Sequence, residues 1–144
     1  MDKLNDLLRK LQDFDRNAER IIIEQSKKFE RNILAWNKEQ LEDGKTSLGK
    51  EITPSYTPFT ISLKRQKGQI SDRVTLKDTG SFQDSFFVIF GDDFFDVYAT
   101  DSKRNKIQKK YGADLYGLQK ENVDKLSLEL KPVMQDEFKK RILV

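Results

Sequence analysis

Apolar side chains recur at spacings of mostly three and four residues through the first forty positions. They are Leu4, Leu7, Leu8, Leu11, Phe14, Ala18, Ile21, Ile22, Phe29, Ile33, Leu34 and Trp36. This spacing predicts one amphipathic helix from residue 2 to about residue 42, capped by Asp2 and ended by Gly44. Such a helix would be roughly 60 Å long at 1.5 Å per residue. That exceeds the needs of a domain this size, so we expect either a projecting arm or a break near Asp15 to Asn17.

A second helical pattern closes the chain, from Gln119 to about Ile142. Its apolar stripe consists of Val123, Leu126, Leu130, Met134 and Phe138. Acidic residues near its start and basic residues near its end suit the helix dipole. Pro132 lies inside the pattern, so we expect a kink there or the start of a further helix.

The centre of the chain alternates like a β-hairpin, with strands at residues 85–90 and 94–99 and a turn at 91–93. One face of the first strand carries Phe86, Val88 and Phe90, and the other carries Phe87 and Ile89. We expect one face to meet the long helix and the other to meet a second subunit. The equally weighted alternative is that the chain covers both faces itself. The candidate interface side chains are Phe87, Ile89, Phe95 and Trp36.

The remaining segments are shorter. Residues 43–60 contain glycines and prolines and are expected to form a loop, and residues 73–77 a short strand. Residues 101–112 are interpreted as a basic linker or short helix. The predicted fold class is therefore α+β, with a long N-terminal helix, a small antiparallel sheet built on the hairpin, and a C-terminal helix. We expect one domain over residues 1–144, divided into a helical arm (1–43), a loop and antiparallel β core (44–118) and the C-terminal helix (119–144).

Composition narrows the chemistry. The 144 residues include no cysteine and no histidine, which excludes disulfides, thiolate metal sites and nucleophile–histidine pairs. The net charge of +3, from 27 basic and 24 acidic residues, is smaller than a general nucleic-acid coat usually carries. Charges interrupt every apolar run of the N-terminal stretch, so we expect neither a signal peptide nor a membrane span. No cofactor and no small-molecule substrate are expected.

The tetrapeptide Asp78-Thr79-Gly80-Ser81 matches the catalytic motif of aspartic proteases. That chemistry needs two such carboxylates sharing a proton. Lys77 stands where the proteases have an apolar run, and the long all-β chain that follows in that family is missing. We therefore interpret Asp78, Thr79 and Gly80 as a turn in which Gly80 has positive φ, and expect no catalytic role for Asp78.

Two basic stretches are candidates for phosphate contact, residues 64–73 and 103–110. The candidate contacts in these stretches are Lys64, Arg65, Lys67, Lys103, Arg104, Lys106, Lys109 and Lys110. No aromatic residue interrupts the second stretch, which disfavours base stacking. The preferred interpretation is a solvated face or a contact with an acidic protein. The acidic group Asp92, Asp93 and Asp96 lacks the spacing of a calcium loop and is interpreted as a charged hairpin tip.

The order of short motifs from residue 49 onward carries a resemblance. The motifs are Gly49-Lys50, Pro54-Ser55-Tyr56, Thr60, Lys64, Lys67-Gly68, Leu76, Asp78-Thr79-Gly80, Phe82, Ser85, Tyr98-Ala99, Gln108, Lys110-Tyr111-Gly112 and Leu115-Tyr116-Gly117-Leu118. In this order they resemble the phage virion-morphogenesis and tail-completion proteins over about two-thirds of the chain. Phe82 stands where that family usually has Leu, and the family's His before the glycine element is absent.

The resemblance implies an α+β protein that forms a ring at the junction between phage head and tail. The hypothesis is a structural virion protein that acts by self-association and by docking neighbouring head or tail proteins, with at most incidental contact to genomic DNA. It would reside in the host cytoplasm before assembly and in the virion afterwards. The alternatives are a nucleic-acid-associated accessory protein that uses the two basic stretches, and an aspartic-type hydrolase built on Asp78.

Overall fold

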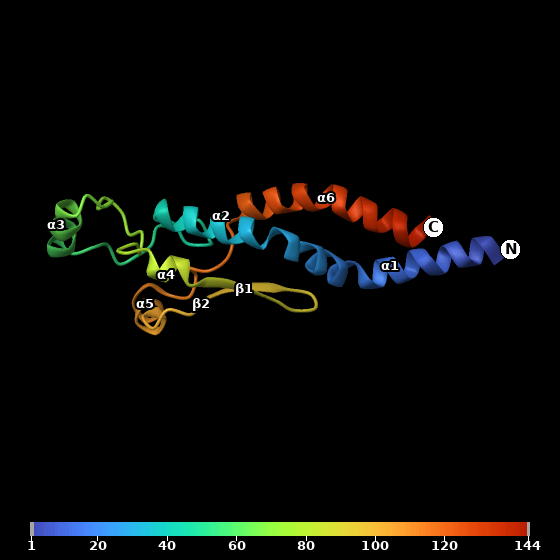
Figure 1. The fold of residues 1–144 in the computed structure, drawn as a ribbon, viewed down its shortest axis with the longest axis horizontal. Coiled ribbons are helices and arrows are strands. Elements are labelled where there is room, and N and C mark those ends of the chain that lie inside the picture. Colours follow the sequence, from blue (N-terminus) through green and yellow to red (C-terminus); the bar gives the residue numbers. More distant parts are fainter. Residues whose placement is uncertain (1, 144) are drawn as a thin grey trace.

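The long amphipathic pattern folds as two helices joined by one tight turn. The computed structural model describes residues 2–143 and has an α+β fold, as predicted (Figure 1). The elements in order are α1 (Asp2–Ser26), η1 (Lys27–Phe29), α2 (Glu30–Glu42), α3 (Pro58–Gln66), α4 (Ser81–Asp84), β1 (Phe86–Phe90), β2 (Phe95–Ala99), α5 (Arg104–Tyr111) and α6 (Lys120–Ile142). Figure 1 shows an elongated molecule, with both chain ends at one extreme and α3 at the other.

The expected break near Asp15 to Asn17 is wrong, because α1 runs unbroken through these residues. The interruption lies at Lys27–Phe29, which form the single 3₁₀ turn η1. Just before it, the buried Ser26 donates its hydroxyl to the Ile22 carbonyl at 2.7 Å. A serine that bonds back to the preceding turn commonly bends a helix, which accounts for the position of the break.

Helix α6 runs back alongside α1, and the two pack as an antiparallel helix pair (Figure 1). The Phe14 and Phe138 rings meet edge to face, with centroids 5.3 Å apart. The buried α6 residues are Asn122, Leu126, Leu130 and Ile142. Val123, expected in the apolar stripe, is exposed. Pro132 does not start a second helix, because α6 continues through it.

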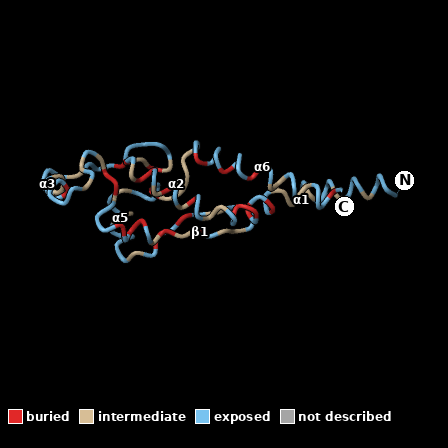
Figure 2. The backbone as a smooth tube through the Cα atoms, turned by 45° about the horizontal axis from the view of Figure 1, so that its top comes forward, coloured by how far each residue is buried: buried red, intermediate tan, exposed pale blue. Residues whose placement is uncertain are grey.

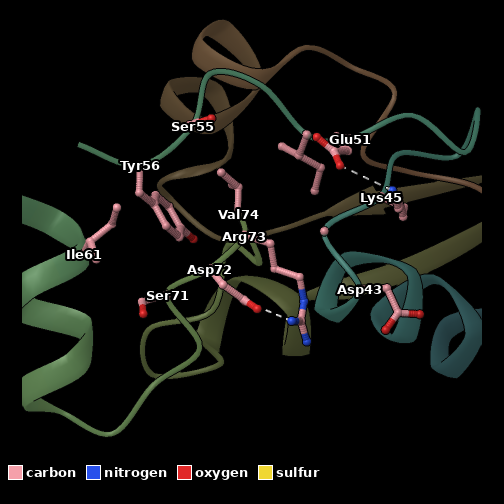
Figure 3. A pocket seen from close by; sticks show the side chains of 12 residues that line it. Asp43, Lys45, Glu51, Ser55, Tyr56, Ile61, Ser71, Asp72, Arg73 and Val74 are labelled. Carbon is pink, nitrogen blue, oxygen red and sulfur yellow. Dashed lines mark hydrogen bonds and ion pairs between the residues drawn. The ribbon is translucent and has the colours of Figure 1, made fainter. Parts of the chain in front are cut away.

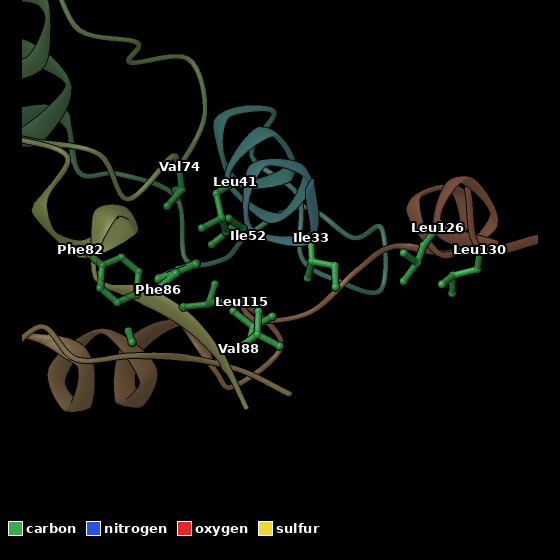
Figure 4. Close-up of a cluster of buried hydrophobic side chains, with 12 residues drawn as sticks. Ile33, Leu41, Ile52, Val74, Phe82, Phe86, Val88, Leu115, Leu126 and Leu130 are labelled. Atoms are coloured by element: carbon green, nitrogen blue, oxygen red, sulfur yellow. The ribbon is translucent and has the colours of Figure 1, made fainter. Parts of the chain in front are cut away.

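The main core lies between α2 and the inner face of the hairpin. Ile33 and Leu41 of α2 are fully buried and belong to one cluster with Phe86, Val88 and Leu115 (Figure 4). The two strands pair antiparallel, with Phe86 opposite Ala99 and Phe90 opposite Phe95. Figure 2 shows buried residues concentrated in this central part, whereas α3 and the start of α1 are mostly exposed. The core therefore fixes the hairpin and leaves both ends of the molecule in solvent.

The expected strand at residues 73–77 does not form. The Tyr56 hydroxyl accepts the backbone N–H groups of Thr75 and Leu76, each at 3.1 Å. Val74 and Thr75 are buried all the same. A side chain thus satisfies backbone groups that a neighbouring strand would otherwise pair.

The loop expected over residues 43–60 ends early, because helix α3 begins at Pro58. Thr57 caps this helix through its hydroxyl, which accepts the Thr60 N–H at 3.2 Å. Proline at the first helical position is a common helix start. Residues 101–112 include the short helix α5, the second of the two interpretations given for that segment.

Candidate functional site

The outer face of the hairpin is a mostly apolar surface that residues 2–143 leave partly uncovered. It also carries the exposed Asp96, whose carboxylate accepts the Tyr98 hydroxyl at 3.3 Å. Ile89 is 44% exposed and lies opposite Asp96, and Tyr98 is 43% exposed and lies opposite Phe87. The Phe87 ring is half-buried against the Tyr98 ring, with centroids 6.0 Å apart. We call Phe87, Ile89 and Tyr98 the hairpin outer face.

The opposite hairpin face belongs to the core, so the two faces differ as the alternation predicts. Phe86, Val88, Val97 and Ala99 are all buried. The four candidate interface residues therefore separate into two pairs. Phe87 and Ile89 point outward, whereas Phe95 and Trp36 pack, partly buried, against the core cluster. We accordingly keep Phe87 and Ile89 as interface candidates and assign Phe95 and Trp36 to packing.

The Asp78-Thr79-Gly80 segment forms a sharp turn before α4. Gly80 has φ of 91°, which confirms the positive φ predicted for it. The exposed Asp78 carboxylate accepts from Gln69 Nε2 and Lys67 Nζ, both at 3.1 Å. The hydrogen bonds from Gln69 and Lys67, with the charge of Lys67, hold the pKa of Asp78 below its ordinary value. These contacts fasten the turn to the end of α3.

The structure brings members of the two basic stretches to one pocket beside this turn. The pocket has a volume of about 220 Å³ and lies between Lys64 of α3, the Gly80 turn and Lys103. Lys64 is buried, donates to the Lys77 carbonyl at 2.9 Å and lies 4.8 Å from the centroid of the Tyr56 ring. Its ammonium thus serves the fold.

The rest of that pocket is poorly suited to phosphate. Its other walls include Leu76, Phe82, Ile107 and Tyr111. The remaining predicted cations are exposed and do not line it, namely Arg65, Lys67, Arg104, Lys106, Lys109 and Lys110. Lys67 pairs with Asp78, and Arg104 donates to the Ala99 carbonyl at 3.1 Å. Of the predicted cations, Lys64 and Lys103 therefore line one pocket, and the other six do not line it.

A second pocket, of about 300 Å³, lies where the loop after α2 meets the segment before the Gly80 turn (Figure 3). Its two cations are already paired. Lys45 lies 3.8 Å from Glu51, and Arg73 lies 2.9 Å from Asp72 and donates to the Glu42 carbonyl. These pairs hold the loops together, and we assign the pocket no chemistry.

A buried polar clamp, which the apolar spacing does not predict, connects α2 to the segment that leads into α6. The Asn37 side chain, 0% exposed, donates to the Leu115 carbonyl at 2.9 Å and accepts the Gly117 N–H at 2.8 Å. Gln40 donates to the Gly117 carbonyl at 2.9 Å and accepts the Gln119 N–H at 2.8 Å. The sequence signal that could have predicted this clamp is a pair of amide side chains, Asn37 and Gln40, three residues apart on an otherwise apolar face of α2.

Tyr116 lies within the clamped segment and joins the aromatic part of the core. Its ring contacts Phe86 with centroids 5.3 Å apart, and the ring of Phe82 is 6.3 Å away. Burial raises the pKa of the Tyr116 hydroxyl, and the charge of Arg104 opposes that rise. The segment that the clamp holds thus also completes the packing under the hairpin.

Neither a metal centre nor a membrane span is visible in the described part of the chain. Within residues 2–143, acidic side chains do not gather in groups of three or more that could hold a metal ion. None of the helices described is long and apolar enough to cross a membrane. Comparison with protein-family models, with curated proteins and with solved structures gave no match.

Proposed function

We propose that the protein is a structural component of a phage particle, at the head–tail junction or in the tail. It acts by self-association and by docking neighbouring virion proteins. The observation that carries the proposal is the hairpin outer face, where Phe87, Ile89 and Tyr98 present apolar surface away from the core. An apolar hairpin face left in water invites pairing with another chain.

The motif order that resembles the tail-completion proteins supports the same proposal. The Gly80 turn opens directly onto α4 and β1, and β2 ends at the Tyr98-Ala99 pair. The Leu115–Leu118 motif lies under the hairpin and leads into α6 through the Asn37 clamp. In this proposal the motifs serve the shape of an assembly unit, and the protein has no catalytic activity.

A nucleic-acid accessory protein is the second candidate. It is favoured by one observation, that Lys64 and Lys103 line the same pocket. Burial of Lys64 and the apolar walls of that pocket make this candidate the weaker one. A mobility shift of DNA that weakens steeply with salt would support it, because released counterions make phosphate contacts salt-dependent.

The experiment that tests the proposed function is a Phe87→Ser, Ile89→Thr double substitution followed by sedimentation or light scattering. Burying each apolar side chain contributes roughly 1.5–3 kcal/mol. We therefore expect the dissociation constant of the assembly to rise by at least about tenfold, which corresponds to about 1.4 kcal/mol. The circular dichroism of the subunit should remain close to that of the wild type.

Leu128→Ser is the matched control, because Leu128 is 72% exposed on α6, away from the hairpin. It removes one exposed apolar side chain outside the proposed interface and should leave association unchanged. If the double variant instead unfolds the isolated subunit, the hairpin outer face is part of the core and the proposed interface is wrong.

A further inference from the structure

The N-terminal end of α1 projects beyond the helix that covers the rest of it. Phe14 lies against Phe138, and α6 ends four residues after Phe138, at Ile142. In the opposite direction α1 extends twelve residues before Phe14, to Asp2. Since both helices rise equally per residue, α1 outreaches α6 by about eight residues, roughly 12 Å. Figure 1 shows this projection at the blue end of the chain. We call residues 2–9 the α1 overhang.

The overhang continues the apolar stripe that α6 covers farther along α1. Leu4, Leu7, Leu11, Phe14, Ala18 and Ile21 follow one another at alternating spacings of three and four residues. This is the repeat by which helices pack side by side in a coiled coil. The stripe becomes gradually more buried along α1. Leu4 is 47%, Leu7 38% and Leu11 37% exposed, Phe14 and Ala18 are half-buried, and Ile21 is buried. The stripe therefore extends past the end of its own partner helix.

An apolar groove lies next to this stripe, near the free end of the α1–α6 helix pair. It has a volume of about 520 Å³ and is lined by Phe14, Met134, Phe138 and Leu143 among others. The groove lies beside the Phe14–Phe138 contact, along the last turns of α6 from Lys131 to Leu143. A helix placed beyond Ile142 would continue the α1–α6 interface past the end of this groove.

The charges around the tip favour a second copy of this chain as the occupant. Arg9 and Lys10 both pair with Asp6, at 2.6 Å and 3.3 Å, so the overhang lacks the strongly basic face of a helix that lies on a membrane. The end of α6 carries Lys139, Lys140 and Arg141, whereas residues 2–9 of α1 carry no net charge and begin with Asp2. A helix start that carries an acid and a helix end that carries bases attract each other.

We propose that the α1 overhangs of two copies pair antiparallel, tip to tip, about a two-fold axis. Leu4 then lies opposite Leu7 of the partner subunit, and each overhang occupies the track beyond Ile142 of the partner subunit. Asp2 comes to rest beside the basic end of α6 of the other copy. The same surface serves both subunits, as two-fold symmetry requires. The inference rests on the proposed function in that it supplies a second self-association surface, distinct from the hairpin outer face.

Cysteine crosslinking tests the register directly, because the natural chain has no cysteine. Leu4→Cys protein is mixed with Leu7→Cys protein and oxidised, and each variant is also oxidised alone. The mixed disulfide should form at least tenfold faster than dimers of a Leu128→Cys control, which reports random collision. A Leu4→Cys variant that crosslinks to itself and not to Leu7→Cys would indicate parallel pairing and overturn the proposal.

A Leu4→Ser, Leu7→Ser double variant separates this inference from the proposed function. This variant should raise the dissociation constant of the contact between two overhangs at least tenfold. The Phe87→Ser, Ile89→Thr substitutions should not slow the disulfide that forms between Leu4→Cys and Leu7→Cys. If the overhang variant associates like the wild type while the hairpin variant does not, the inference is wrong and the proposed function stands. If neither variant alters association, both are wrong. An overhang that binds anionic lipid vesicles and gives no crosslink would assign the stripe to a lipid surface and overturn the inference.

Discussion

Asn37 shows how a single buried amide can organise a connection between distant parts of the chain. Its side chain makes two hydrogen bonds to a segment nearly eighty residues away, at Leu115 and Gly117. An apolar residue at this position would leave the Gly117 N–H and the Leu115 carbonyl without these partners. Unsatisfied buried polar groups typically cost about 1–3 kcal/mol each.

Asn37→Leu is therefore expected to lower the free energy of unfolding by about 2 kcal/mol or more, by loss of these two bonds. Urea denaturation followed by circular dichroism measures the change. Glu39→Leu, on the exposed side of the same helix, is the control and should change the unfolding free energy little. Equal effects of the two substitutions would show that the clamp contributes nothing specific.

Gly80 is a residue whose conformation follows from the sequence alone. Its φ of 91° is uncommon for residues with a Cβ. A Cβ added at this position would meet its nearest neighbour, the Asp84 carboxylate, at an ordinary 3.6 Å. Backbone strain rather than crowding therefore dominates the effect of any substitution here.

Gly80→Val should lower the free energy of unfolding by more than about 1 kcal/mol. Gly80→Asn should have a smaller effect, because asparagine tolerates positive φ better than a β-branched residue. Thermal melts of the two variants make the comparison. A larger loss for Gly80→Asn than for Gly80→Val would contradict the strain argument.

Among the elements, those with a strong periodic pattern could be predicted and those set by single contacts could not. Both long helical segments and the hairpin follow from apolar spacing. The break at Lys27–Phe29 depends on the hydroxyl of Ser26, and the absence of a strand at residues 73–77 depends on the hydroxyl of Tyr56. Such side-chain bonds between or within elements leave no periodic trace in a sequence.

The hairpin outer face, too, could be predicted only where it follows from a periodic pattern. Alternation placed Phe87 and Ile89 on one face of β1, and the structure keeps them together outside the core. Alternation could not tell that Trp36 and Phe95 pack against the core, since that depends on how α2 approaches the hairpin. The convergence of Lys64 and Lys103 on one pocket likewise depends on tertiary packing.

Helix α6 offers a prediction at the level of one element. Pro132 is exposed within a continuous helix and lacks the N–H that would bond to the Leu128 carbonyl. Pro132→Ala should raise the free energy of unfolding, by up to about 3 kcal/mol on intrinsic propensity. Thermal denaturation measures the effect, with the exposed Lys131→Ala as control. A destabilised Pro132→Ala protein would mean that α6 needs the proline to follow the surface of α1.

At the scale of the whole molecule, a small core supports two apolar surfaces that face solvent. The hairpin outer face lies beside the core, and the α1 overhang lies at the free end of the α1–α6 helix pair (Figure 1). Separate surfaces on an elongated unit let one copy contact more than one neighbour. That arrangement fits an assembly component better than an enzyme built around one cleft.

The central claim, that this chain is an assembly unit, is tested most directly by the mass of the purified wild-type protein over a concentration series. Sedimentation or light scattering reports that mass, and the chain itself has a mass of 16.9 kDa. We expect a mass that rises with concentration to at least twice that of the chain, and that rises less at each concentration when Phe87 and Ile89 are replaced. A mass of one chain at every concentration up to the solubility limit would contradict it.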